Sequence, residues 1–177
     1  MAEFIPALKK VLAREGGYSI DPDDPGGETY KGIARRMHSK WCGWGQIDLY
    51  KRQSGFPENL DKDVGLQSEI EQFYQVNFWD KVCGDLYANQ SVAESIFNFA
   101  VNAGVGVSAS LAQMVADAHV DGVIGNQSIA KINAVDPEHF HAAFTVAKIA
   151  RYAAIVRKRS GCKKYFYGWV CRALECA

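Results

Sequence analysis

The sequence predicts a mainly α-helical fold with a small β-hairpin after the first helix. Apolar residues recur three or four residues apart along most of the chain, which is the spacing of one face of an α-helix. Residues 18–34 differ, because they are dense in Asp, Pro and Gly, and they predict a long loop or a short hairpin. With 177 residues, of which 48% are hydrophobic, the chain is long enough for one compact body with a substantial core.

Three helices are expected in the first half of the chain. The first covers residues 4–12, and Gly16 and Gly17 then end the apolar pattern as a helix C-cap does. A second helix is expected over residues 32–53, interrupted by two glycines. A third is expected over residues 63–82, where aromatic residues mark the buried face.

The second half is richer in alanine and predicts helices throughout. Two adjoining helices are expected over residues 91–104 and 107–120, followed by a short helix with Asn126 as its N-cap. A longer helix follows Pro137, and the aromatic cluster "KYFYGWVCRAL" closes the chain.

The change in composition predicts a domain boundary near residue 90. Residues 1–92 then form one part and residues 93–177 form a helical lobe. Since no Gly/Ser-rich or Pro-rich linker joins the two, we expect the lobe to be integral to one compact body.

Charge and length narrow the choice of partners. Twenty Lys and Arg balance twenty Asp and Glu, so the bulk charge offers no attraction to nucleic acid or to an anionic membrane. No segment is apolar over the length needed to cross a bilayer, so no membrane insertion is expected. We expect a soluble monomer.

The five cysteines are scattered and never form a CxxC pair, so free thiols in a reducing compartment are expected. A disulfide between two of the last three stays open. Zinc-ligand spacings are lacking, and "DPDDPG" does not begin an EF-hand loop, because the twelfth position from Asp21 is Gly32. The sequence therefore predicts no metal and no cofactor.

The N-terminus lacks the charged and apolar regions of a signal peptide. We therefore expect that the protein is synthesised in the cytoplasm and is not exported by means of a signal peptide.

Glu15 is the candidate general acid. If it lies in the last turn of the first helix, the negative end of the helix dipole and burial behind Tyr18 both disfavour its ionised form. Cleavage of a glycosidic bond needs such a protonated carboxyl group. Gly16 and Gly17 would let a bulky sugar approach it. The alternative is a solvated glutamate beside a helix cap.

Further candidate site residues lie in the loop after the first helix and later in the chain. Asp24 or Asp23 can stabilise positive charge on the sugar or orient water, and Thr29 can position that water. The rings of Tyr18 and Tyr30, with Trp41 and Trp44, can line a sugar groove or belong to the core. Asn98 and Asn102, one helical turn apart, can bond N-acetyl groups or cap and solvate a helix.

The motifs "EGGY", "DPDDPGGETYKGIA", "FNFAVNAGVG" and "DGVIGNQSIAKIN" resemble glycoside hydrolase family 108. That family contains N-acetylmuramidases of the lysozyme type, among them bacteriophage endolysins and bacterial proteins once labelled secretion activators. The resemblance implies a lysozyme-like helical fold, with Glu15 as the catalytic acid and a peptidoglycan-binding part at roughly residues 95–175. The order Glu, Asp, Thr is also similar to that of other phage-type lysozymes, with a slightly shorter spacing from Asp24 to Thr29.

We therefore expect a peptidoglycan hydrolase that cleaves the β-1,4 bond between N-acetylmuramic acid and N-acetylglucosamine in glycan strands. Two alternatives stay open. One is a catalytically inactive module that binds the wall or regulates secretion, against which the intact EGGY motif argues. The other is a lytic transglycosylase, which also uses a single glutamate but forms an anhydro sugar. Release through a phage holin pore is the simplest route to the cell wall.

Overall fold

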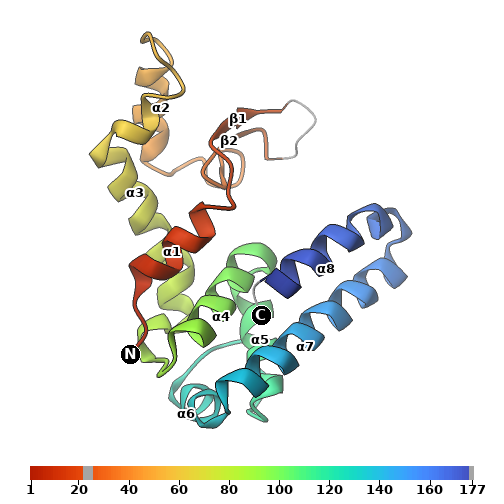
Figure 1. Cartoon of the computed structure of the whole chain (residues 1–177). Coiled ribbons are helices and arrows are strands. Elements are labelled where there is room, and N and C mark those ends of the chain that lie inside the picture. Colours follow the sequence, from red (N-terminus) through yellow and green to blue (C-terminus); the bar gives the residue numbers. More distant parts are fainter. Residues whose placement is uncertain (22–25, 176–177) are drawn as a thin grey trace. The chain divides into compact units, whose positions relative to one another are not determined.

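The computed structural model describes residues 1–21 and 26–175 (Figure 1). The chain divides into two compact units, one of residues 8–77 and one of residues 1–7 together with 78–177. Within the described ranges there are eight α-helices and one small antiparallel sheet, which follows the first helix. The predicted fold class is therefore confirmed. The predicted boundary near residue 92 stays a prediction.

The unit of residues 8–77 is built on a three-stranded sheet, two whole α-helices and most of a third. The strands pair in the order β1-β2-β3, with Tyr18 opposite Tyr30 and Thr29 opposite Ala34. The elements are most of α1 (Phe4–Leu12), β1 (Tyr18–Ile20), β2 (Glu28–Tyr30), β3 (Ile33–Ala34), α2 (Gly43–Tyr50), a 3-10 helix (Leu60–Lys62) and α3 (Val64–Tyr74), which continues into a π-helical turn (Gln75–Trp79).

The helix predicted over residues 32–53 is wrong in its first part. Ile33 and Ala34 pair with β2 instead, and the N–H of Arg35 donates to the Glu28 carbonyl oxygen at 2.8 Å. Turns follow, and α2 begins only at Gly43. The sheet therefore takes the backbone groups that a longer helix would have used.

The other unit is helical. Two short 3-10 helices (Asp80–Val82 and Gly84–Leu86) lead into α4 (Gln90–Ala103), α5 (Val105–Val115), α6 (Asn126–Ala134) and α7 (Pro137–Lys158). A 3-10 helix (Ser160–Tyr165) then turns the chain into α8 (Phe166–Glu175), which lies antiparallel beside α7 (Figure 1). No helix among the described residues is both long and apolar enough to cross a membrane.

Side-chain caps begin two of these helices. Asn89 accepts hydrogen bonds from the N–H groups of Ser91 and Val92 at the start of α4, and Asp136 accepts one from His139 at the start of α7. At α6 the prediction was wrong by one residue, because Gly125 is the N-cap and Asn126 is already helical. Gly125 is in the extended conformation that an N-cap residue adopts.

Aromatic rings fill the core of the helical unit. Phe97 on α4 packs edge-on against Phe4 and Trp79, at ring-centroid distances of 6.1 and 5.4 Å. Phe99, on the same helix, packs against Phe144 of α7 at 5.7 Å. Phe97 and Phe144 have no exposed surface, so α4 is anchored on both sides.

Candidate active site

Glu15 lies just beyond the end of α1. The helix ends at Leu12, but the N–H of Glu15 still donates to the Val11 carbonyl oxygen at 3.2 Å, as in one more helical turn. The residue is thus held at the C-terminal end of α1, slightly later than the predicted last turn. Gly16 and Gly17 are exposed, and no atom lies within 4 Å of where a Cβ would be on either. The backbone beside Glu15 is therefore open to a bulky ligand.

Gly32 brings Glu15 close to a tyrosine of α3. Lys31 and Gly32 form the tight turn between β2 and β3, and both have a positive φ, of 47° and 79°. A Cβ on Gly32 would lie 2.6 Å from Glu15 Oε2 and 2.6 Å from the hydroxyl oxygen of Tyr74. The carboxyl group and the hydroxyl group therefore meet over Gly32, in a space that no other residue type would leave.

Tyr74 is fixed in this position. Its hydroxyl donates a hydrogen bond of 2.7 Å to the Lys31 carbonyl oxygen, and its side chain is buried. Burial raises the pKa of Tyr74, and the negative charge of Glu15 raises it further. The phenol consequently stays protonated beside the carboxyl group at neutral and acidic pH.

Three of the predicted site residues lie in the sheet beside this turn. Thr29 is central in β2, and its hydroxyl donates to the Gly27 carbonyl oxygen at 3.4 Å. Tyr18 is partly exposed, with its ring edge-on to Phe56 at 4.6 Å. Tyr30 is only 1% exposed, so it is a core residue and offers no ring face to a sugar.

The hydroxyl group of Tyr30 is also hydrogen-bonded to two side chains. It donates to Asp61 at 3.1 Å and accepts from Gln67 at 3.1 Å. Burial raises the pKa of Tyr30 to about 12. The alternative that this residue serves packing is thus the one that the structure supports.

A second glutamate, Glu28 of β2, is held in its charged form. Arg35 and Lys51 contact its carboxylate at 2.8 and 2.6 Å, and both also contact Asp48. Burial alone would raise the pKa of Glu28, but hydrogen bonds from Lys51, Arg35 and Tyr18 outweigh burial and lower it. A carboxylate paired in this way is a poor proton donor, which sets Glu28 apart from a general acid.

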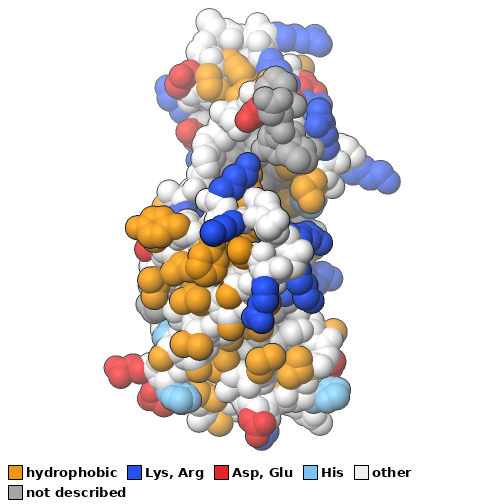
Figure 2. Space-filling view, turned by 90° about the vertical axis from the view of Figure 1, so that its right-hand side faces the viewer, with side chains coloured by type: hydrophobic (Ala, Val, Ile, Leu, Met, Phe, Trp, Pro, Cys, Tyr) orange, Lys and Arg blue, Asp and Glu red, His pale blue; other side chains and the backbone are white. Residues whose placement is uncertain are grey.

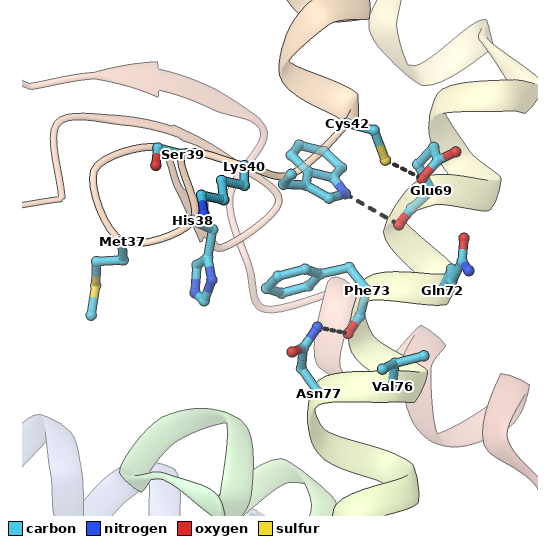
Figure 3. Close-up of a pocket in the computed structure, with 11 residues that line it drawn as sticks. Met37, His38, Ser39, Lys40, Cys42, Glu69, Gln72, Phe73, Val76 and Asn77 are labelled. Carbon is cyan, nitrogen blue, oxygen red and sulfur yellow. Dashed lines mark hydrogen bonds between the residues drawn. The ribbon is translucent and has the colours of Figure 1, made fainter.

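An open pocket of about 610 Å³ lies in the same unit, between the turns of residues 37–42 and α3 (Figure 3). His38 and Trp41 pack edge-on against Phe73, at centroid distances of 4.8 and 6.2 Å. The Cys42 thiol donates to the Glu69 carboxylate at 2.6 Å, and this hydrogen bond raises the pKa of Cys42. Trp41 thus lines a pocket, whereas Trp44 is buried at 3% exposure.

Two of the predicted residues belong to the helical unit. The Asn102 amide donates to the backbone oxygen and the side-chain oxygen of Asn98, at 2.8 and 2.7 Å, and its own side-chain oxygen accepts from Arg172. Asn98 thus has its partner on α4, and Asn102 has partners on α4 and α8. The predicted residues Asp23 and Asp24 lie outside the described residues. Among the described residues, no group of His, Cys, Asp and Glu is arranged to hold a metal ion.

Comparison with known families shows which protein family this chain belongs to. A family model described as glycosyl hydrolase 108 matches residues 8–104, which is more than half of the chain. The chain belongs to the glycosyl hydrolase 108 family. A second model, described as a predicted peptidoglycan domain, matches residues 106–174. The recognised resemblance is thereby confirmed, and the family is one of glycosidases.

A solved structure, that of SagA from Brucella abortus, has the same fold. It is 24% identical in sequence, has a TM-score of 0.72, and the match covers 98% of this chain and 90% of that chain. No protein of curated function matched the sequence. At this identity, the likeness to SagA concerns the fold alone.

Sequence reasoning missed two members of the site, Gly32 and Tyr74. Gly32 lies in the quoted motif "TYKGIA", and a glycine two residues after a predicted strand was the available signal for a tight turn. Tyr74 was assigned only to the buried face of its helix. Its hydroxyl was the available signal, because a buried tyrosine normally bonds a polar partner.

Proposed function

We propose that this member of the glycosyl hydrolase 108 family is an N-acetylmuramidase of the lysozyme type, with Glu15 as its general acid. The observation that carries the proposal is the meeting of the Glu15 carboxyl group and the Tyr74 hydroxyl over Gly32, beside the open backbone of Gly16 and Gly17. These residues fall inside the stretch that matches the family model.

The chemistry follows from these groups. Glu15 gives a proton to the glycosidic oxygen, and the bond between the two sugars breaks. Water then adds to the sugar carbon that carries positive charge in the transition state, and the proton that this water loses goes to a carboxylate of the site. The Gly32 turn leaves space for the carboxyl group next to the fixed Tyr74 hydroxyl, and we propose that this space positions Glu15 for proton transfer. Asp24 and Thr29 are proposed to assist on the water side.

The two matched families support a proposal for the substrate. A glycosidase part followed by a predicted peptidoglycan domain supports peptidoglycan glycan strands as the polymer that is cut. We propose the β-1,4 bond after N-acetylmuramic acid as the point of cleavage. The aromatic pocket of His38, Trp41 and Phe73 is proposed to hold a sugar ring of the same strand, because ring faces stack on pyranose faces. We propose that the protein acts on the cell wall after release through a holin pore.

Glu15→Gln tests the proposal. The amide keeps the shape of the side chain but has no acidic proton, so we expect the variant to fold normally and to lose about 10²–10⁴-fold of its activity on purified peptidoglycan. Glu58→Gln is the matched control, because Glu58 is exposed in the same unit. It should clear peptidoglycan turbidity as fast as the wild type.

Analysis of the released sugars decides the reaction class. Products with a reducing N-acetylmuramic acid end support the proposal. Anhydro sugars would identify a lytic transglycosylase, and binding without any released product would identify an inactive wall-binding module. A folded Glu15→Gln variant that clears peptidoglycan at the wild-type rate would remove Glu15 as the acid.

A further inference from the structure

Positive charge is concentrated near the C-terminus. From Arg151 to Arg172 the sequence has seven Lys and Arg and no Asp or Glu, although the whole chain has a formal net charge of zero. The chain therefore contains a strongly basic segment although its net charge is zero, and this segment can attract an anionic surface.

This segment is the end of α7, the 3-10 turn of residues 160–165 and most of α8, which together form a helical hairpin. We call residues 151–175 the basic hairpin. Its cationic side chains at the turn, Lys163 and Lys164, are exposed. Figure 2 faces this end of the helical unit and shows Lys and Arg side chains next to hydrophobic ones.

One face of α8 packs against α7. Trp169 lies against Tyr152 of α7, with ring centroids 5.3 Å apart, and Ala173 is only 2% exposed. Tyr165 stacks on Trp169, with ring centroids 6.1 Å apart. This face accounts for the packing of the hairpin.

A second apolar stripe on α8 faces outward. Tyr167 is 81% exposed and Leu174 is 57% exposed, and Cys171 lies between them at helical spacing, with its thiol hydrogen-bonded to the Tyr167 side chain. Tyr165, in the turn before α8, is 52% exposed. A surface helix normally has polar residues on its outward side, so an outward stripe of this kind needs a partner.

We propose that the basic hairpin docks on an anionic phospholipid surface, with the outward stripe of α8 at the boundary between headgroups and acyl chains. Lys163 and Lys164 lie at the start of the stripe, where Lys164 Nζ is 4.9 Å from the ring centroid of Tyr165, as cations flank the apolar face of interfacial helices. Tyrosines favour the same depth, since the ring is apolar and the hydroxyl group reaches water.

The chemistry of the stripe favours lipid over a glycan. Sugar rings need hydrogen-bond donors and acceptors around an aromatic platform, whereas Leu174 extends this stripe with a side chain that forms no hydrogen bond, and the Cys171 thiol is already bonded to Tyr167. An exposed leucine on the same stripe as a tyrosine, with lysines in the turn before the helix, is better suited to acyl chains under phosphate headgroups. The inference does not depend on Glu15 or on the reaction proposed above.

Flotation of the full-length, reduced protein with vesicles tests the proposal. We expect binding to vesicles that contain phosphatidylglycerol and none to vesicles of phosphatidylcholine alone. Lys163→Gln with Lys164→Gln should weaken partitioning about 30-fold at low ionic strength. Lys81→Gln with Lys131→Gln is the matched control, since both lysines are exposed in the same unit and the charge change is equal. This control should bind as the wild type does.

A third variant separates apolar contact from charge. Leu174→Ser changes an exposed side chain, so the fold should persist, and it should weaken vesicle binding even in high salt. Equal loss in the Lys81/Lys131 control, or no binding to anionic vesicles by the folded wild type, overturns the proposal. It is also overturned if Leu174→Ser abolishes a dimer of the protein instead, or if the Lys163/Lys164 variant loses binding to purified peptidoglycan and keeps vesicle binding.

Discussion

Replacement of Gly32 by alanine should damage the candidate site in two separable ways. With φ at 79°, an alanine here is strained by about 1–2 kcal/mol. Its Cβ would also lie 2.6 Å from both Glu15 Oε2 and the Tyr74 hydroxyl, where ordinary contacts are 3.4–4 Å. The carboxyl group must therefore move by about 1 Å, a displacement that can cost about 100-fold in rate.

The matched control is Gly55→Ala. Gly55 lies in the same unit with φ at 88°, and nothing lies within 4 Å of its Cβ position, so this variant has the backbone strain without the overlap. We expect both variants to melt about 2–8 °C below the wild type, as the strain implies for a chain of this length. Only Gly32→Ala should lose about 100-fold of its activity on purified peptidoglycan.

The two measurements are thermal unfolding by circular dichroism and the initial rate of turbidity loss. If Gly32→Ala melts as Gly55→Ala does and keeps full activity, the clearance over Gly32 does not position Glu15, and the site must be built differently. Equal loss of activity in both variants would point to backbone strain alone.

Three further predictions concern stability. The four cysteines described by the structure are free thiols, so melting temperatures with and without reductant should agree, and a fall of several degrees on reduction would contradict this. Residues 1–90 expressed alone should be insoluble or molten and inactive, because they lack Phe97, which packs against Trp79; a soluble, active fragment that melts cooperatively would show a detachable second half. Because hydrogen bonds lower the pKa of Glu28, its ion pairs stabilise the fold above pH 4.5 and this contribution is lost as the pH falls through the lowered pKa. Glu28→Gln should therefore lower the free energy of unfolding by about 1–3 kcal/mol at pH 7 and flatten its acid dependence, and an unchanged acid profile would refute the role of the pair.

Residue spacing and turn-forming residues predicted most helices correctly. They failed where pairing with a strand competes with helix formation. The helices over residues 4–12 and 91–104 follow from the spacing of their apolar residues and from the glycines at their ends. The helix expected from residue 32 failed, because pairing with β2 claims Ile33 and Ala34. A single sequence shows the local preference for helix or strand, but it does not show which distant segment a residue pairs with.

The sequence by itself determined the helical class, the small hairpin, the family motifs and Glu15 as the candidate acid. These depend on residues close together in the chain, whose periodicity and turn chemistry are local properties. Only the tertiary structure decided that Gly32 and Tyr74 lie beside Glu15, and that Tyr30 belongs to the core. The physical reason is that the space over Gly32 is bounded by side chains 17 and 42 residues away in the sequence. Such clearance exists only when the turn after β2 packs against α3.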